Sequence, residues 1–431
     1  MQYYSTNNKA PKVNFKDATI NGQAPDKGLY FPENIPVFPK HILDSIEDYS
    51  NEEIAYEVIK PYVGDTIPNE ILKKIVAETV NFPIPLVPIT DNIFSLELYH
   101  GPTLAFKDIG ARFMSRCLSY FLRDQSQKVT VLVATSGDTG GAVANGFYDV
   151  PNVDVVILYP SGKVSTVQEK QLTTLGKNIT ALEINGTFDD CQQMVKEAFA
   201  DVALCKKIFL TSANSINAAR WLPQQFYYYF AYKQWADKNN LPIISVPSGN
   251  FGNICAGMMA QASGLPVKHF IAACNANDVV PNFLETNNYI PQKAVATISN
   301  AMDVGNPSNF VRILEIFEKN IFSLKEKVSA QSITDDETKA TLKTVYETQH
   351  YLLDPHAAVG YKALQNYIQN NNQKGIVIET AHPVKFYDIV EPIINAKVPI
   401  PESVQQQLSL TKKAVLMENN YEKLKEYLSG N

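Results

Sequence analysis

One stretch of the chain reads Val129-Thr130-Val131-Leu132-Val133-Ala134-Thr135-Ser136-Gly137-Asp138-Thr139-Gly140-Gly141, and Ala142-Val143-Ala144-Asn145-Gly146-Phe147 follows it. The part before Thr135 is apolar or β-branched and uncharged, which is typical of a strand buried in a parallel sheet. The part after it has a helical pattern. A strand, a glycine-rich turn and a helix start together direct backbone N–H groups and hydroxyls at an anion. This stretch therefore predicts an α/β fold with an anion site at a strand end.

The same pattern returns about a hundred residues later. There Ile243-Ile244-Ser245-Val246 precedes Pro247-Ser248-Gly249-Asn250-Phe251-Gly252-Asn253, and a helical Ile254-Cys255-Ala256-Gly257-Met258-Met259-Ala260 comes next. Either turn by itself is equally consistent with an ordinary strand-to-helix connection. Two of them in one chain favour a ligand site.

Short apolar runs alternate with helical patterns from about residue 92 onward, which predicts parallel sheet. At 431 residues the chain is too long for one ordinary core, so we expect two or three domains. Residues 1–80 have a mixed, proline-containing pattern. We expect further strands at 153–159, 179–184, 207–210, 270–274 and 376–379, a long helix at 217–235, and a charged helical segment at 319–349.

A lysine stands at the edge of an apolar run in Tyr99-His100-Gly101-Pro102-Thr103-Leu104-Ala105-Phe106-Lys107-Asp108. If the stem of Lys107 enters a dry pocket, burial lowers the pKa of its amine, which then can attack a carbonyl. An aldehyde cofactor bound as a Schiff base needs such an amine. The alternative is a solvated amine on a buried stem, which is the commoner arrangement.

Three segments together resemble the threonine synthases: His100–Asp108, Ser136–Gly140 and Pro247–Asn253. These enzymes belong to a pyridoxal-phosphate superfamily whose fold is shared with tryptophan synthase β and the serine/threonine dehydratases. The lysine segment is specific to the family, and the glycine turns are specific only to the superfamily. The likeness extends to Ser212–Asn217 with Arg220, to Asn300–Val304 and to Thr380–Pro383.

The resemblance implies an α/β enzyme of fold type II, with two parallel-sheet domains and the site in the cleft between them. It implies a mixed α+β N-terminal domain at 1–80 and a catalytic region at 81–431. Within that region, we expect a smaller subdomain at about 110–225 and a larger one in the remainder.

The resemblance also implies pyridoxal 5′-phosphate as the cofactor, with Lys107 as the catalytic lysine. Gly249, Asn250, Phe251, Gly252 and Asn253 would hold the cofactor phosphate, and Thr380 would lie near the pyridine nitrogen. Thr135, Ser136, Gly137 and Thr139 would hold the substrate carboxylate. Asp138 would point away and stabilise the turn, because its charge repels a carboxylate.

Ser212, Asn214, Asn217 and Arg220 are candidates for binding the substrate phosphate, although helix capping explains them equally well. Lys163 is a further candidate for that phosphate. The roles of His100, His382 and Asp108 stay open between proton transfer and structure.

The implied reaction is a β,γ-replacement that converts O-phospho-L-homoserine and water to L-threonine and phosphate, the last step of threonine biosynthesis. One alternative is a related lyase that releases 2-oxobutyrate. A second is a non-catalytic phosphoamino-acid binder. A nucleotide-binding protein ranks last, because neither turn reads G-x-G-x-x-G or ends in Gly-Lys-Ser/Thr.

Composition excludes other classes of function. The net charge is −6 without a long basic block, so we expect no nucleic-acid partner. No apolar run approaches the ~18 residues of a membrane span, and the N-terminus is polar. The five cysteines are scattered without a CxxC pair, which predicts free thiols in the cytoplasm and no metal site. We expect a monomer, with a dimer as the alternative.

Overall fold

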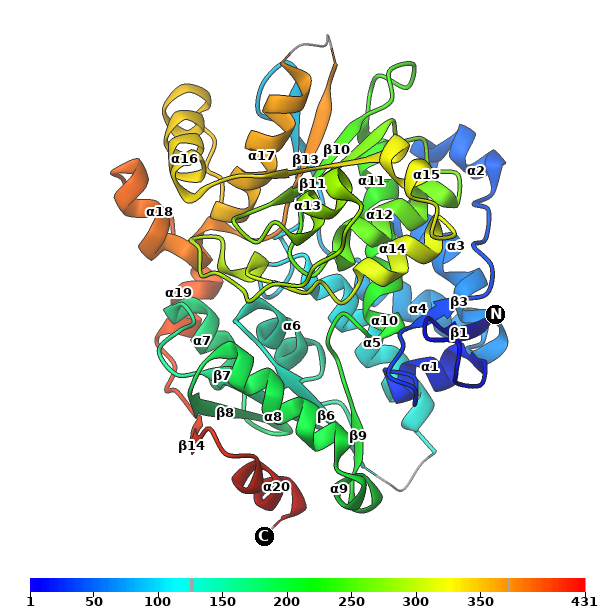
Figure 1. Cartoon of the computed structure of the whole chain (residues 1–431), viewed down its shortest axis with the longest axis vertical. Coiled ribbons are helices and arrows are strands. Elements are labelled where there is room, and N and C mark those ends of the chain that lie inside the picture. Colours follow the sequence, from blue (N-terminus) through cyan, green and yellow to red (C-terminus); the bar gives the residue numbers. More distant parts are fainter. Residues whose placement is uncertain (125–127, 370–372, 431) are drawn as a thin grey trace.

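A computed structural model of the chain describes residues 1–124, 128–369 and 373–430. Figure 1 shows a small N-terminal unit packed beside two larger α/β layers. The N-terminal unit contains an antiparallel sheet in the order β2-β1-β3, built from β1 (Gln2–Ser5), β2 (Val13–Asn14) and β3 (Tyr30–Pro32). Its helices are α1 (Phe15–Asn21), α2 (Lys40–Asp44), η1 (Ile46–Asp48), α3 (Asn51–Val63), η2 (Gly64–Thr66) and α4 (Asn69–Thr79).

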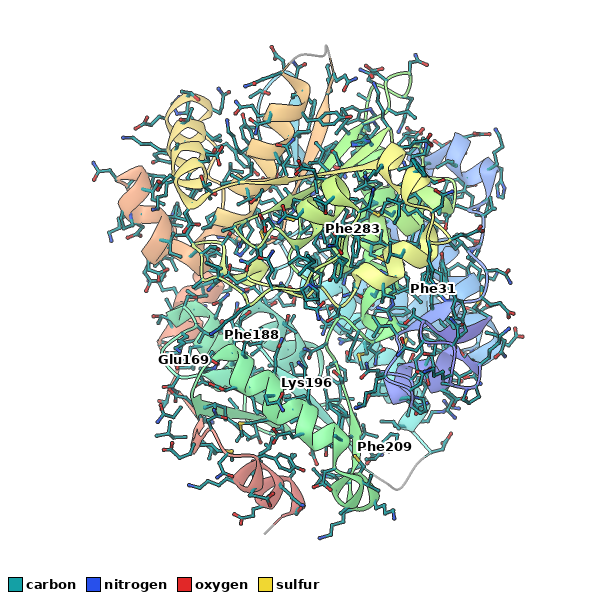
Figure 2. The ribbon with its side chains drawn as sticks, viewed as in Figure 1. Phe31, Glu169, Phe188, Lys196, Phe209 and Phe283 are labelled. Atoms are coloured by element: carbon teal, nitrogen blue, oxygen red, sulfur yellow. The ribbon has the colours of Figure 1, made fainter. Side chains whose placement is uncertain are left out.

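The first predicted strand lies inside a five-stranded parallel sheet with the order β14-β8-β7-β6-β9. Its strands are β6 (Val129–Ala134), β7 (Val153–Pro160), β8 (Ile179–Asn185), β9 (Phe209–Thr211) and β14 (Val415–Glu418). The edge strand β14 comes from the far end of the chain. Its helices are α6 (Asp138–Gly146), α7 (Thr166–Thr173), α8 (Phe188–Ala200), α9 (Val202–Lys207), α19 (Glu402–Leu408) and α20 (Tyr421–Ser429). Figure 2 locates α8 in front of this sheet by Phe188 and the exposed Lys196.

The second sheet has six strands in the order β12-β11-β10-β13-β5-β4, and β4 alone runs antiparallel to its neighbour. Its strands are β4 (Leu86–Pro88), β5 (Ile93–Glu97), β10 (Ile243–Pro247), β11 (His269–Cys274), β12 (Val328–Ser332) and β13 (Gly375–Glu379). The helices around it include α12 (Gly252–Ala262), α13 (Val279–Thr286), η4 (Asn300–Met302), α14 (Phe310–Ile316), α15 (Ile321–Lys327), α16 (Asp335–Gln349), α17 (Pro355–Ile368), η5 (Pro383–Phe386) and α18 (Tyr387–Ile394). The predicted α/β class with two parallel sheets is confirmed.

Helix α5 (Lys107–Leu122) joins the parts, because it packs against α1, α4 and α6. Its other neighbours are α10 (Ala218–Trp221) and η3 (Leu222–Gln225), which precede α11 (Phe226–Gln234). The side chains of Trp221, Tyr227, Tyr228 and Tyr229 are fully buried. The aromatic cluster therefore fills the core between α3, α12 and α11, as expected of inter-element packing.

Two predictions about helices are wrong in detail. The expected continuous helix at 217–235 is broken into α10, η3 and α11, with Pro223 inside the 3-10 turn. Proline removes a backbone donor and disfavours a regular helix interior. The segment 319–349 is not wholly helical, because β12 lies between α15 and α16 and forms an edge of the six-stranded sheet.

The division of the chain at residue 80 and the range 110–225 stay predictions. The strand β14 lies outside that range and still pairs with β8 of the same sheet. Within the described residues, no helix is both long enough and apolar enough to cross a membrane.

Candidate active site

Lys107 is the first residue of α5, and its side chain is 18% exposed. Its Nζ lies 4.5 Å from the centre of the Phe106 ring. Burial lowers the pKa of the Lys107 amine, and the positive charges of Lys385 and Arg220 lower it further. The apolar run before Lys107 thus places the amine in the partly dry environment that the sequence predicts.

Asp138 faces Lys107, contrary to the expectation that it points away. Its Oδ2 lies 3.7 Å from Lys107 Nζ, and its Oδ1 lies 2.7 Å from Lys385 Nζ. Gln168 Nε2 also donates to Oδ1 at 2.9 Å. Burial alone would raise the pKa of Asp138, but the two lysines hold that pKa well below its usual range. The carboxylate therefore stays charged between the two lysine side chains.

Lys385 is the partner that sequence reasoning missed. Its side chain is fully buried, and its Nζ donates to Thr103 O at 2.9 Å as well as to Asp138. Lys385 comes from η5, after the six-stranded sheet, whereas Asp138 begins α6 over the five-stranded sheet. The ion pair therefore connects the two sheets next to Lys107. Its only signal in the sequence is a lysine between Val384 and Phe386.

Asp108 does not face the amine of Lys107. Its carboxylate accepts hydrogen bonds from Thr103 N at 2.9 Å and Thr103 Oγ1 at 2.5 Å. Burial raises the pKa of Asp108, and these two bonds oppose that effect. Asp108 thus fixes the turn that Lys385 also binds through the carbonyl of Thr103.

The segment around Thr380 lies alongside the segment of Lys107. Phe106 N donates to Thr380 O at 2.9 Å, and His382 N donates to Leu104 O at 3.1 Å. Thr380 is 7% exposed and directly follows β13. Burial lowers the pKa of His382 to about 4, so this ring is neutral near pH 7. A neutral ring that accepts the Val384 N–H at Nδ1 favours a structural role for His382.

The turn before α12 presents its backbone. Phe251 adopts a left-handed conformation with φ 60°, and α12 starts at Gly252. A Cβ at residue 249 would lie 2.6 Å from Met302 Cα, so only glycine fits there. The Asn250 side chain donates to Ser215 Oγ at 2.8 Å. The first N–H groups of this helix have no partner within it, so they could bind an anion.

Asn253 is held by two tyrosines of α11. The hydroxyls of Tyr227 and Tyr228 each donate to Asn253 Oδ1 at 2.7 Å. Asn253 Nδ2 is buried and has no hydrogen-bond partner among the described residues. An amide that is oriented at one end and unpaired at the other fits a ligand acceptor.

The turn after β6 uses Thr135 to hold its own backbone. Thr135 Oγ1 accepts hydrogen bonds from Gly137 N at 2.9 Å and Gly140 N at 2.8 Å. Thr135 is 1% exposed, whereas Ser136 and Thr139 are half-buried. Ser136 and Thr139 are therefore the better donors for a ligand at this turn.

The candidate substrate-phosphate residues divide into two groups. Asn217 is satisfied by the protein, because its Nδ2 donates to Thr19 O and Ser212 O and its Oδ1 caps Ala219 N. Arg220 and Asn214 differ: Arg220 Nε and Asn214 Oδ1 are buried without a partner among the described residues. Burial lowers the pKa of Arg220 to about 10. Arg220 and Asn214 are thus the groups of this set that could bind a ligand.

Arg220 lies close to Lys107. A Cβ on Gly110, one turn along α5 from Lys107, would lie 3.2 Å from Arg220 Nε. Arg220 also donates through Nη1 to Ala213 O. Lys163, in contrast, is exposed in the turn at 161–164, and its charge acts on Asp190.

Arg312 is a second buried cation that the sequence did not indicate. It is fully buried and donates to backbone oxygens of Tyr30, Ser215 and Ile216. Burial lowers the pKa of Arg312 to about 10. It therefore connects the N-terminal sheet to the loop that holds Asn250.

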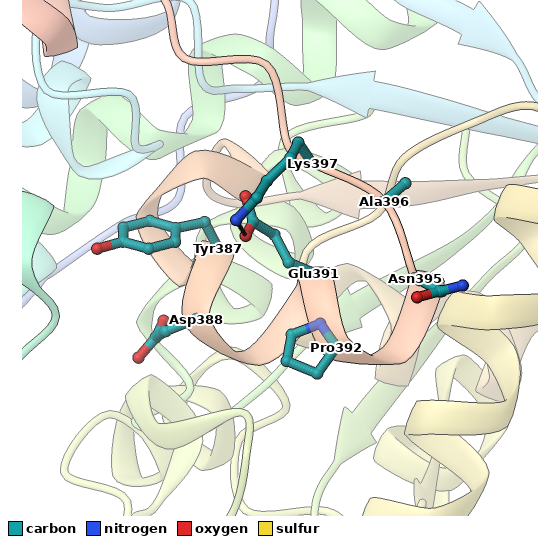
Figure 3. Close-up of a pocket in the computed structure, with 7 residues that line it drawn as sticks. All are labelled: Tyr387, Asp388, Glu391, Pro392, Asn395, Ala396 and Lys397. Carbon is teal, nitrogen blue, oxygen red and sulfur yellow. Dashed lines mark hydrogen bonds and ion pairs between the residues drawn. The ribbon is translucent and has the colours of Figure 1, made fainter.

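Figure 3 shows the residues that line an open pocket at α18 and the turn after it. The volume of this pocket is about 410 Å³. Its charged residues include Glu391 and Lys397, which already form an ion pair of 2.6 Å. None of its lining residues belongs to the site around Lys107. Its residues are Tyr387, Asp388, Glu391, Pro392, Asn395, Ala396 and Lys397.

Comparison with protein families matches three parts of the chain. Residues 82–379 match the family described as pyridoxal-phosphate dependent enzyme. Residues 2–80 match the threonine synthase N terminus, and residues 357–428 match the threonine synthase C-terminal family.

Individual relatives agree over the full length. Threonine synthase from Haemophilus influenzae is 42% identical over 99% of both chains, and the one from Escherichia coli is 43% identical over 95% of both. The crystal structure of the Escherichia coli enzyme superposes with a TM-score of 0.94 over 100% of both chains at 41% identity. A pyridoxal-phosphate-bound threonine synthase from Brucella melitensis gives a TM-score of 0.92 at 35% identity, over 100% of this chain and 99% of that one.

Proposed function

This chain belongs to the threonine synthase family of pyridoxal-phosphate-dependent enzymes, and we propose that Lys107 is the catalytic residue with which it converts O-phospho-L-homoserine and water to L-threonine and phosphate. The observation that carries the proposal is the meeting of three segments. The Lys107 segment bonds to Thr380 O through the N–H of Phe106, and the Lys107 amine lies 3.7 Å from Asp138, within the first glycine-rich turn.

The side chains present fit the cofactor. Its phosphate needs backbone donors, which the turn at 249–253 offers with the unpaired Asn253 Nδ2. Its aldehyde needs an amine of lowered pKa, which Lys107 supplies, and Thr380, whose carbonyl accepts the N–H of the neighbouring Phe106, would offer its hydroxyl to the ring nitrogen. Bound there, pyridoxal phosphate would supply an aldehyde that bonds amines and a ring that withdraws electrons from the neighbouring carbons.

Lys107 would move protons between neighbouring carbons of the substrate. One base that serves several atoms needs a flexible stem and a pKa near neutral. Burial and Lys385 lower the pKa of Lys107, and Asp138 raises it. Lys385 and Asp138 thus shift the pKa of Lys107 in opposite directions, so their ion pair adds little net charge beside the Lys107 amine.

Substrate contacts follow from the groups that remain unpaired. Ser136, Thr139 and the backbone at Gly137 would bind the carboxylate, and Thr135 would hold that turn in shape. Arg220 would bind the substrate phosphate, because its buried Nε is a donor without a partner among the described residues, whereas the unpaired Oδ1 of Asn214 would accept from a donor of the substrate. Ser212 and Asn217 would orient this second set.

The related lyase that releases 2-oxobutyrate remains the second candidate. The buried guanidinium of Arg220 argues against a dehydratase whose substrate has no phosphate, since an unpaired buried cation is costly. We also infer a monomer in the cytoplasm, with no nucleic-acid or membrane partner; the five cysteines are free thiols, as a reducing compartment favours.

The experiment replaces Lys107 by alanine in the full chain and adds pyridoxal phosphate. We expect the visible absorbance band of the bound cofactor in the unchanged protein and its loss in the variant. Phosphate and threonine should form in equal amounts from O-phosphohomoserine, and the rate should fall at least ~10³-fold in the variant, because proton transfer and covalent binding are both lost. Lys397→Ala, on an exposed lysine, is the control.

Three results would redirect the proposal. Formation of 2-oxobutyrate in place of threonine would keep the site and change the reaction to a lyase. A folded Lys107→Ala variant with an unchanged band and rate would exclude Lys107 as the catalytic residue. Binding of O-phosphohomoserine without any product would favour the phosphoamino-acid binder.

A further inference from the structure

Two carboxyl groups meet at the ends of β5 and β13. Glu97 and Glu379 are partners in the parallel register of these strands. The relative exposure is 9% for Glu97 and 0% for Glu379. Two carboxylates this close in a buried environment repel each other, so that one of them favours its neutral form.

A tyrosine hydroxyl bridges the two carboxyl groups. Tyr351 OH lies 2.7 Å from Glu97 Oε1 and 2.5 Å from Glu379 Oε2. A phenol carries one proton and can donate it along only one such short contact. The other contact is a hydrogen bond only if its carboxyl group donates to the phenol oxygen. Two carboxylates and a phenol together contain one proton, so the two short contacts require a second proton.

The surroundings assign this proton to Glu379. Glu97 Oε2 lies 2.7 Å from Nε2 of His100, whose side chain is one-third exposed. Burial would raise the pKa of Glu97, but the bonds from His100 and Tyr351 lower it. Burial raises the pKa of Glu379, and the nearby charge of Asp354 raises it further.

Among the described residues no cation pairs with Glu379 itself, and Asp354 pairs with His356 at 2.5 Å between Oδ1 and Nδ1. Ser95 Oγ donates to Glu379 Oε2 at 2.8 Å, and Glu379 Oε1 has no partner among the described residues. The Tyr99 hydroxyl is neutral, because burial and both glutamates raise its pKa. The His382 ring, which packs against Tyr99, is neutral near pH 7.

We propose that Glu97, Tyr351 and Glu379 hold one proton in addition to that of the phenol, carried by Glu379 as a neutral carboxylic acid, and that this proton holds together the two segments that bear Lys107 and Thr380. Glu379 O accepts the Leu98 N–H at 3.0 Å, at the start of the Lys107 segment. Removal of the proton leaves two adjacent carboxylates, whose repulsion separates these segments. The three residues are positioning residues and touch no reacting atom.

The additional proton makes stability depend on pH with a defined sign. The pKa of a glutamate in the unfolded chain is about 4.5, and that of Glu379 in the folded chain is raised. At a pH between these two pKa values, the folded state binds one proton more than the unfolded state. The stabilisation is complete below about pH 4.5 and is lost as pH rises, by about tenfold in the folding equilibrium constant per pH unit.

The first experiment measures urea unfolding of the full chain at a series of pH values from about 6 to 8. In Glu379→Gln, the amide replaces the neutral acid and donates to Tyr351 without titrating. We expect the folding constant of the unchanged protein to fall about tenfold more per pH unit than that of the variant. The exposed Glu33→Gln, whose partner is Lys12, should follow the unchanged protein. Equal pH dependence in Glu379→Gln and the unchanged protein would overturn the proposal.

Infrared spectroscopy tests the proton directly at pH 7. A protonated carboxyl group has a C=O stretching band separate from that of a carboxylate. We expect Glu379→Gln to remove one such band and Tyr351→Phe to shift it, because the hydrogen bond to the phenol is lost. Identical spectra for the unchanged protein and Glu379→Gln would place the proton elsewhere and contradict the proposal.

Hydrogen exchange tests the mechanical consequence. The protection of the Leu98, Phe106 and His382 amides should decrease from pH 7 to the alkaline range in the unchanged protein and stay constant in Glu379→Gln. Equal protection of these amides in both proteins at every pH would contradict the proposal that the proton holds the two segments together. These signals belong to the chain alone, so they would persist if Lys107 proved not to be catalytic.

Discussion

The two glycine-rich turns have the same strand–turn–helix form, but only one of them contains a charged side chain. The turn at 135–140, on the five-stranded sheet, contains Asp138 buried between Lys107 and Lys385. The turn at 249–253, on the six-stranded sheet, contains no charged residue. Its polar side chains are oriented by bonds to the protein, and its backbone and the unpaired Asn253 Nδ2 remain for a ligand.

This difference shows that a sequence pattern does not define the chemistry of a turn. That chemistry is defined by the residues that the fold brings next to the turn. In the first turn a charged side chain sets the environment of Lys107, so charge is the sensitive property. In the second turn the close approach of backbone to backbone is the sensitive property. The following substitutions separate the two cases.

The largest effect is expected for Asp138→Asn. This change leaves Lys385 fully buried without an anion and should destabilise the protein by about 3–5 kcal/mol, as measured by urea unfolding at pH 7. The double variant Asp138→Asn with Lys385→Met should recover most of this loss. Asp149→Asn, in an exposed pair with Lys177, is the matched control and should change little. A loss below ~1 kcal/mol in Asp138→Asn would mean that Lys385 finds another partner.

An intermediate effect is expected for Gly249→Ala. The added Cβ would lie 2.6 Å from Met302 Cα, so that backbone must move, at a cost of about 1–3 kcal/mol. Because this backbone presents the N–H groups, cofactor affinity should fall as well. Gly137→Ala is the comparison: its Cβ meets only the Gln168 side chain, and its φ of 136° strains the first turn instead. Equal loss of cofactor affinity in both variants, by fluorescence titration, would refute the distinction.

The smallest effect is expected for Tyr228→Phe. Asn253 Oδ1 keeps the hydroxyl of Tyr227, so only the contacts that the single Tyr228 hydroxyl makes with Asn253 Oδ1 and Asn253 O are lost, and stability should fall by about 0.5–1.5 kcal/mol. The double variant with Tyr227→Phe should lose more than the sum of the two single changes, because Oδ1 is then buried without a donor. Thermal unfolding of the four proteins measures this coupling, and strict additivity would argue against a shared acceptor.

Local sequence patterns predicted most of the fold. The strands of both sheets and the turns after β6 and β10 are continuous in sequence, so periodicity and glycine spacing reveal them. The break in the 217–235 helix has a local signal in Pro223, because proline disfavours a regular helix interior. The short edge strand β12 had a weak signal, since its burial is only partial.

The parts of the site that the sequence did not reveal depend on contacts between distant residues. Asp138 and Lys385 are far apart in the chain and meet only because α6 and η5 face each other across the two sheets. Without Lys385, Asp138 is reasonably expected to turn away from a ligand carboxylate. The bridge from Tyr351 to Glu97 and Glu379 likewise needs the pairing of β5 with β13. Periodicity contains no information about such pairs.

The edge strand β14 has a consequence for synthesis of the protein on the ribosome. Its partner β8 ends at Asn185, and β14 begins at Val415, about 230 residues later. At about 5–20 residues per second, the edge of β8 waits roughly 10–50 s for the strand that covers it. An unpaired strand edge is a template for pairing with other chains. The nascent chain is therefore most exposed to aggregation in the interval before its last residues emerge, when chaperones would have the most to protect.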